Sequence, residues 1–215
     1  MAGGSVDEVT SVLLALALMH ARWWQDRTLG EQSWTRLPSM LAPSAQAEVF
    51  EQAWPLFVDK LSPSDVDASA AKEWISRELH GAATTLLETG PRTLIHNDVQ
   101  PDNLFFIPQA GRPVVFLDWQ LATYGRCVVD VACAIRSTLD IAIRRRVEPA
   151  LLRRYHRALV EAGVQDYPFE QCQADYQLAT VLVPGRLASA VGLTPTLHAH
   201  PGAFWDTVFP RLCAR

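Results

Sequence analysis

The sequence predicts a mostly helical α+β protein with a small β-hairpin region. Two observations predict this class. Apolar residues recur at helical spacing over most of the 215 residues. Between 93 and 119 the period changes, and three short runs, "TLIH", "NLFFI" and "VVFLDW", are rich in β-branched and aromatic residues. The length is close to that of one domain, so we expect residues 1–215 to form a single compact unit.

Helices dominate the first 90 residues. Ser5 stands three residues before Glu8, the pattern of a capping box, and the apolar spacing after it predicts a helix over about 6–25. Four prolines restrict 26–70 to short helices and turns, among which "SAQAEVFEQAWPLF" is the best helical piece. The stretch 67–90 predicts a second long helix that ends near Gly90.

The strand region leads into a helical C-terminal half. "PQAGRP" has the Gly and Pro of a hairpin turn between the last two strands. A third long helix is expected over 128–146, ending on three arginines that suit the negative end of a helix. Pro149 and Gly163 suit the first turn and the end of the next helix, and "FEQCQADYQLATVLVPGRLASAVGL" predicts a last helix broken at Pro184-Gly185.

Composition excludes several classes of function. The formal charge is −4 and no basic stripe is visible, which argues against a nucleic-acid partner. The apolar run 12–19 is too short to span a bilayer, and the residues before it include acidic side chains and no Lys or Arg, unlike a signal peptide. The four cysteines lack CxxC spacing and are expected to be packed free thiols. A cytoplasmic protein without a membrane partner is expected.

Residues 94–106, "LIHNDVQPDNLFF", concentrate polar groups between two strands. Asp98 and Asn103 lie five residues apart on this loop, and Asp118 ends the next hairpin strand, so three oxygen-bearing side chains could converge. Carboxylate and amide oxygens without His or Cys suit Mg²⁺ bound together with phosphates, which indicates phosphoryl transfer. One loop Asp would act as base, while an Asn and an Asp would hold the metal. The alternative is a polar loop whose Asp and Asn only form turns.

The motif "HNDVQPDN" resembles the catalytic loop H-x-D-x-x-x-x-N of the protein-kinase-like superfamily. Its form is that of aminoglycoside phosphotransferases and of choline-kinase-like and ecdysteroid-kinase-like enzymes. "VVFLDWQLATYGRCVVDVACAI" resembles the next part of the family pattern: a strand, a metal-binding Asp, a loop, and an Asp that opens a buried helix. "LALALMHARWW" resembles the first helix of the family's larger lobe, so the resemblance covers about two thirds of the chain.

The resemblance implies a role for each matching position. Asp98 would be the catalytic base, and Asn103 and Asp118 the magnesium ligands. His96 would be a structural member of the loop, and Asp130 the helix-borne carboxylate that accepts backbone hydrogen bonds from it. The chain departs from the family pattern twice. Asn97 stands where a small residue, often Gly, is usual, and Trp119-Gln120 replaces the Phe-Gly of protein kinases. Asn tolerates the unusual backbone angle that such a position requires.

The resemblance also implies cofactors and partners. ATP would be the phosphate donor, Mg²⁺ the metal, and the acceptor a hydroxyl of a small molecule. The fold implied is the larger, C-terminal lobe of the kinase-like fold alone. The N-terminal lobe that covers the nucleotide is not recognisable, since the two lysines, Lys60 and Lys72, lie outside any strand-like context. A second hypothesis, from a different class, is therefore a truncated, non-catalytic kinase-like protein that acts as a binding module.

Other residues allow two interpretations each. Three carboxylates could attract a cationic amino sugar or choline, or could be ordinary surface charges. They belong to Asp140, Asp175 and Asp206. His20, Trp23 and Trp24 are expected in the core, although one of them could line the substrate cleft. "HAH" at 198–200 is expected to be a surface loop, because a metal site would need a third ligand. Asp102 is expected to be exposed.

Overall fold

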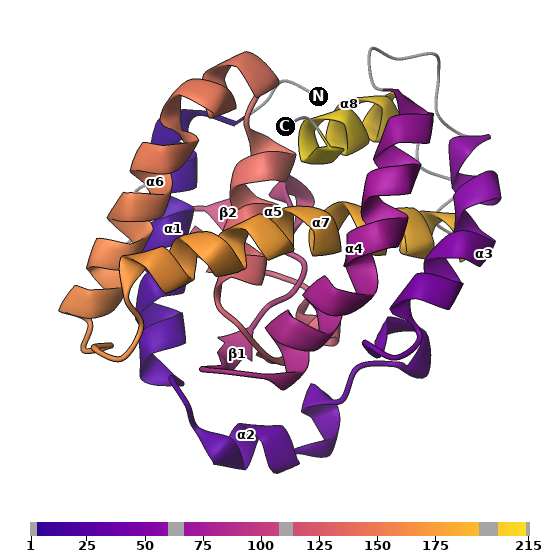
Figure 1. Ribbon diagram of the computed structural model, residues 1–215. Coiled ribbons are helices and arrows are strands. Elements are labelled where there is room, and N and C mark those ends of the chain that lie inside the picture. The colour runs from indigo at the N-terminus through magenta and orange to yellow at the C-terminus, as the bar shows by residue number, and fades with distance from the viewer. Residues whose placement is uncertain (1–3, 60–66, 108–113, 194–201, 214–215) are drawn as a thin grey trace.

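The computed structural model describes residues 4–59, 67–107, 114–193 and 202–213, without the side chains of 202–207. Figure 1 shows a helical body that carries short strands. The described residues form eight α-helices: α1 (Val6–Arg22), α2 (Arg27–Glu31), α3 (Gln46–Val58), α4 (Ala68–Glu88), α5 (Val128–Thr138), α6 (Ile141–Glu161), α7 (Phe169–Leu193) and α8 (Gly202–Cys213). They also form four strands: β1 (Thr93–Ile95), β2 (Leu104–Phe106), β3 (Val114–Phe116) and β4 (Thr123–Gly125). The predicted mostly helical α+β class is confirmed.

Helix α7 forms the centre of the molecule. It crosses the middle of Figure 1 and packs against α3, α4, α5 and α8. Its apolar residues face in several directions rather than forming one stripe, as expected of a helix that other helices surround. Gly192 permits the closest approach, because a Cβ there would lie 2.3 Å from the carbonyl oxygen of Ala53 on α3.

The predicted break at Pro184-Gly185 is wrong, since α7 runs through both residues without interruption. Both are buried, and a Cβ on Gly185 would lie 2.8 Å from the side chain of Leu79 on α4. Proline removes one backbone donor and strains a helix, but packing against neighbouring helices offsets this local cost. The sequence signal was therefore local, whereas the outcome depends on tertiary contacts.

The predicted helix over 128–146 is also wrong, because the chain breaks earlier, at Leu139 and Asp140. The Asp140 side chain accepts a hydrogen bond from the backbone N–H of Ala142 and so caps a new helix, α6. This helix continues through Pro149 to Glu161, so the three arginines lie near its beginning and not at a negative end. Arg144 is fully buried, with its Nε 3.8 Å from the carboxylate of Glu148.

The other long helices agree closely with their sequence signals. The capping box is present at α1, where Ser5 and Glu8 exchange hydrogen bonds, and this helix ends three residues earlier than predicted. Helix α4 begins after Asp67, whose side chain accepts hydrogen bonds from two backbone N–H groups. Just beyond its end, Gly90 has a φ of +69°, which a glycine adopts without steric cost. The helix predicted over 67–90 is confirmed.

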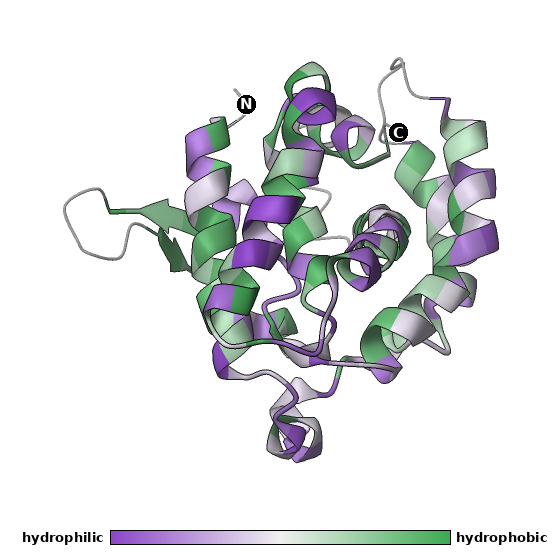
Figure 2. Cartoon of the chain, turned by 60° about the vertical axis from the view of Figure 1, so that its left-hand side comes forward, coloured by the Kyte–Doolittle hydropathy of each residue, from purple (hydrophilic) through white to green (hydrophobic). Residues whose placement is uncertain are grey.

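Two small antiparallel sheets hold the polar loop. Strands β2 and β3 form the predicted pair, with Phe105 opposite Val115, and their connecting turn lies outside the described residues. In Figure 2 these apolar strands project from the helical body, and Phe105 is 59% exposed. Strand β1 pairs with β4, a strand that we did not predict from the sequence. The two pairings fix both ends of the loop between β1 and β2.

Two further expectations concern the cysteines and the membrane. The four cysteines are buried free thiols, as predicted. Burial raises the pKa of the Cys127 and Cys213 thiols to about 12, so both are protonated and unreactive at neutral pH. Among the described residues, no helix combines the length and apolar character that a membrane crossing requires.

Candidate functional site

One buried carboxylate fixes the backbone of the loop between β1 and β2. Asp130, in the first turn of α5, accepts hydrogen bonds from the backbone N–H groups of His96 (2.7 Å) and Asn97 (2.6 Å). The Nε2 atom of His20 lies 3.2 Å from the same carboxylate, and its Nδ1 lies 2.8 Å from the hydroxyl of Tyr155. A carboxylate near the beginning of a helix also interacts favourably with the helix dipole. The loop backbone therefore has little freedom to move.

Asn97 changes the direction of the backbone directly before Asp98, which is half-buried. Its φ is +68°, in the left-handed region that Asn tolerates better than most residues. Its side-chain amide donates to the carbonyl of Leu121 (3.1 Å), and its side-chain oxygen accepts a hydrogen bond from the guanidinium of Arg186. The departure from the usual small residue thus adds two contacts that glycine could not make.

His96 connects the loop to the segment after β3. It is fully buried, and its Nε2 lies 2.8 Å from the backbone carbonyl oxygen of Leu117. The ring also packs against Trp119, with 4.6 Å between ring centroids. These contacts bring the segment that holds Asp118 beside the loop that holds Asp98, and they leave His96 itself away from the open side of the site.

Asp98 is held on both carboxylate oxygens. The side-chain amide of Gln100 donates to Oδ1 at 2.6 Å, and that of Asn103 donates to Oδ2 at 2.9 Å. Burial raises the pKa of Asp98 above its ordinary value, although these two hydrogen bonds oppose the rise, and the negative charge of Asp118 adds to it. Asp98 is therefore a rigid carboxylate with strengthened basicity.

Asp118 lies on a segment that runs beside the loop of Asp98 and Asn103. The backbone N–H of Leu117 donates to the carbonyl of Asn103 at 2.9 Å, which joins the two segments directly. Asp118 has a φ of +59°, and its exposed carboxylate accepts one hydrogen bond, from Gln120. An exposed carboxylate and an amide oxygen are the donor set of a magnesium ion that keeps several waters. No cluster of three or more His, Cys, Asp or Glu that could hold a metal ion is found where the structure is described.

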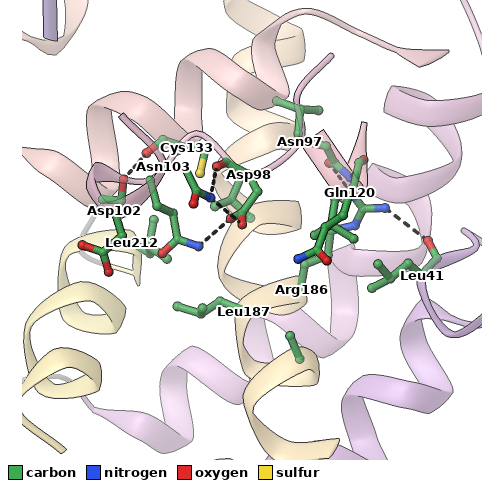
Figure 3. Close-up of a pocket in the computed structure, with 16 residues that line it drawn as sticks. Leu41, Asn97, Asp98, Asp102, Asn103, Gln120, Cys133, Arg186, Leu187 and Leu212 are labelled. Carbon is green, nitrogen blue, oxygen red and sulfur yellow. Dashed lines mark hydrogen bonds between the residues drawn. The ribbon is translucent and has the colours of Figure 1, made fainter. Parts of the chain in front are cut away.

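A cavity of about 400 Å³ opens beside this loop. Figure 3 shows Asp98 and Asn103 joined by hydrogen bonds on one side of it, while Gln120 and Arg186 lie on another. The remaining lining is largely apolar and comes from the segment before α3, the segment after β3, and helices α5, α7 and α8. The residues that line the cavity are Leu41, Asn97, Asp98, Gln100, Asp102, Asn103, Gln120, Leu121, Val129, Cys133, Ser137, Val183, Arg186, Leu187, Ala190 and Leu212.

Sequence reasoning missed two polar residues of the site. Gln100 holds Asp98, although it lies inside the quoted loop motif and was given no role. Arg186 lines the cavity from the middle of α7, at a place where we predicted a helix break. A single arginine within the apolar run "VLVPGRLASAV" is a signal that could have identified it, since a buried charge requires a reason.

Three carboxylates outside the loop are the candidates for attracting a cationic substrate. Asp175 is 1% exposed and forms an ion pair with Arg126, so it is not a surface charge. Asp140 is exposed at the beginning of α6, and the side chain of Asp206 and the histidines at 198–200 lie outside what is described. Asp102 is exposed, as expected, at the edge of the cavity.

The aromatic candidates at and just beyond the end of α1 are partly in the core. His20 is fully buried, while Trp23 and Trp24 are half-buried. The indole N–H of Trp24 donates to the carboxylate of Asp166, at the opposite end of α1 from Ser5. None of the three lines the cavity described above.

Comparison with known proteins gives a family match. A model described as "Phosphotransferase enzyme family" matches residues 10–169. The acyl-CoA dehydrogenase family member 11 of Gallus gallus is 28% identical over 120 residues, which make up 55% of this chain and 14% of that protein.

Solved structures show similarity at lower identity. A candidate aminoglycoside phosphotransferase from Ralstonia eutropha has a TM-score of 0.49 at 16% identity, and covers 96% of this chain and 61% of its own. A macrolide 2'-phosphotransferase from Brachybacterium faecium has a TM-score of 0.44 at 15% identity, over 100% of this chain and 62% of its own. The chain thus spans less than two thirds of the length of each of these proteins.

Proposed function

The chain belongs to the phosphotransferase enzyme family, and we propose that it takes part in transfer of the γ-phosphate of ATP to a hydroxyl of a small molecule, with Mg²⁺ as cofactor. One observation supports this above all others. Asp98, held on both carboxylate oxygens and raised in pKa, borders an apolar cavity large enough for a small molecule. We also propose that the described residues are the larger lobe of a kinase-like enzyme.

Asp98 is the catalytic base of this proposal. An acceptor hydroxyl in the cavity donates its proton to the Asp98 carboxylate as its oxygen attacks the γ-phosphorus, and ADP leaves. A pKa raised above the ordinary value brings a carboxylate closer to neutral pH, where a general base is most effective. The hydrogen bonds from Gln100 and Asn103 fix the direction in which the carboxylate points.

Asn103 and Asp118 are the proposed holders of Mg²⁺. Asn103 directs its amide N–H toward Asp98, so its carbonyl oxygen points elsewhere and suits a hard cation. Asp118 is exposed at the end of the segment after β3. A bound magnesium ion would neutralise charge on the phosphates of ATP.

His96 and Asp130 are positioning residues in this proposal. Asp130 aligns the backbone of His96 and Asn97, and His96 joins that backbone to the segment that leads to Asp118. Neither side chain is among those that line the cavity. They therefore contribute by fixing the distance between the base and the proposed metal-binding groups.

The experiment that tests this proposal measures ADP formation from Mg-ATP in the presence of a panel of small hydroxyl compounds. Asp118→Ala removes a proposed metal ligand, while Asp7→Ala removes an exposed carboxylate in the first turn of α1. We expect ADP formation that requires both Mg²⁺ and an acceptor, persists in Asp7→Ala and is lost in Asp118→Ala. Unchanged turnover in Asp118→Ala would refute the metal assignment.

A further inference from the structure

Arg186 is a buried cation for which the structure provides no countercharge. It is 9% exposed, and in the part of the chain that is described no ion pair joins it to a carboxylate. Its guanidinium donates to two neutral oxygens, the side chain of Asn97 and the backbone carbonyl of Leu41 (3.2 Å), as Figure 3 shows for the latter. Its Nε has no hydrogen-bond partner among the described residues.

The other buried arginines show how this chain normally treats such a charge. Arg126 pairs with Asp175, and Arg136 lies 3.2 Å from the carboxylate of Glu148. Burying a charge without a partner is costly, and burial lowers the pKa of Arg186 to about 10 with no opposing charge to restore it. An uncompensated guanidinium at the wall of a cavity is the arrangement expected of a group that awaits an anion.

We propose that Arg186 binds an anionic group of the acceptor, so that the substrate is an apolar hydroxyl compound that carries a carboxylate or similar anion. This inference rests on the proposed function, because it takes the bound anion to be part of the molecule that accepts the phosphate. It replaces the cationic substrate that the sequence suggested, whose buried candidate carboxylate, Asp175, already has Arg126 as its partner.

The layout of the cavity supports an acceptor with two different ends. Arg186 contacts Asn97, the residue directly before Asp98, so the anion site and the base are held by neighbouring residues of one loop. The cavity is also lined by apolar side chains, among them Leu41, Leu121, Val183 and Leu187. A hydroxyl would meet Asp98 while the anion meets Arg186, and the acidic groups at the Asp98 side would repel the opposite orientation.

The test compares three eight-carbon probes by calorimetric titration, without nucleotide: hydroxyoctanoate, aminooctanol and octanol. We expect hydroxyoctanoate to bind the unmodified chain at least about tenfold more tightly than the other two, the size expected of a charged hydrogen bond. The result would overturn the proposal if hydroxyoctanoate binds no better than octanol, if aminooctanol binds best, or if hydroxyoctanoate does not bind at millimolar concentration.

Three variants distinguish anion binding from a merely structural role. Arg186→Met removes the charge and keeps an apolar side chain, and Arg186→Gln keeps a donor without charge. Both should lose the carboxylate preference, while binding of octanol stays within about twofold. The matched control, Arg153→Met, removes an exposed arginine of α6 outside the cavity and should keep the preference. A preference that survives in both Arg186 variants would contradict the proposal, as would equal weakening of all three probes.

ATP is the other source of an anion, and a separate titration with Mg-ATP distinguishes it. If Arg186→Met weakens Mg-ATP binding tenfold and leaves hydroxyoctanoate binding unchanged, the arginine serves the donor and the proposal is wrong. Because the probe titrations contain no nucleotide, carboxylate preference can be present in a chain that transfers no phosphate. Failure of the proposed function and failure of this inference therefore give different results.

Discussion

The side-chain amide of Asn103 donates to the carboxylate of Asp98 at 2.9 Å and, over the same distance, to the backbone carbonyl of Asp98. One amide group thus fixes both the side chain and the backbone of the proposed base. In our proposal the side-chain oxygen of the same residue is a magnesium ligand. Base and metal site are therefore linked through a single side chain.

This link gives the first prediction. Asn103→Ala should lower kcat of phosphoryl transfer by about 100-fold or more, because Asp98 loses a positioning bond and the metal loses a ligand. The Mg²⁺ concentration that gives half-maximal rate should rise as well. Steady-state kinetics at several Mg²⁺ concentrations measure both effects. An unchanged Mg²⁺ dependence would mean that Asn103 positions Asp98 without holding metal.

The raised pKa of Asp98 gives a prediction about pH. A base must be ionised, so kcat/KM should fall as the pH drops through the pKa of Asp98, at a pH above the value of about 3.9 for a free aspartate. Between the unfolded and the folded pKa, the folded chain binds a proton that the unfolded chain has released. The contribution of Asp98 to stability is therefore greatest below the unfolded pKa and declines as pH rises through the folded pKa.

Urea unfolding of the unmodified chain and of Asp98→Asn across the acidic range measures this contribution as a difference. We expect the advantage of aspartate over asparagine at this position to shrink as pH rises, and the variant to be at least as stable as the unmodified chain at neutral pH. A difference that grows with pH would mean that hydrogen bonds outweigh burial at this carboxylate.

Asp130 gives a prediction about the support of the loop. Asp130→Asn removes the charge and one acceptor from a fully buried group that serves two backbone N–H groups and His20. Unfolding free energy should fall by about 1–3 kcal/mol, the usual cost of leaving a buried donor unsatisfied. Chemical denaturation measures this loss. Asp7→Asn, the same change at an exposed position of α1, should cost much less.

Two glycines provide an internal comparison of helix packing. Gly192→Ala places a Cβ 2.3 Å from the Ala53 carbonyl oxygen and should destabilise the chain, because backbone must move to admit it. Gly81→Ala meets nothing within 4 Å inside α4 and should stabilise by about 0.5–1 kcal/mol through helix propensity. Thermal unfolding of both variants measures the two changes in stability, which should have opposite signs. A Gly192→Ala variant as stable as the unmodified chain would contradict the close packing of α7 against α3.

Signals that are local in sequence predicted the fold well where local chemistry decides the structure. The capping box at Ser5, the helix end near Gly90 and the β-branched and aromatic runs of β2 and β3 each depend on neighbours within a few residues. Burial of the four cysteines agrees with their apolar context. Each of these features appears in the structure.

The errors arose where distant contacts decide. Pro184 does not end a helix, because α7 is enclosed by helices from both halves of the chain. The three arginines at 144–146 do not end one either, because Asp140 begins a new helix before them. Strand β4 was missed because its pairing with β1 is a tertiary contact between segments about 30 residues apart.

The candidate site shows the same division. The loop motif drew attention to Asp98, Asn103 and Asp118, whose mutual approach depends on the hairpin between them. Arg186 lies far along the chain, on a helix that we expected to be interrupted, and no pattern near it points toward the loop. Only the packing of α7 brings this arginine to the cavity.

Transfer of radiolabelled γ-phosphate from Mg-ATP to a panel of hydroxyl compounds tests the central claim most directly. The unmodified chain is compared with Asp98→Asn and with the control Asp7→Asn. We predict labelled product from the unmodified chain and the control, and a rate at least about 100-fold lower in Asp98→Asn. Equal rates for Asp98→Asn and the unmodified chain, or no labelled product with any acceptor, would contradict phosphoryl transfer by Asp98 in this chain.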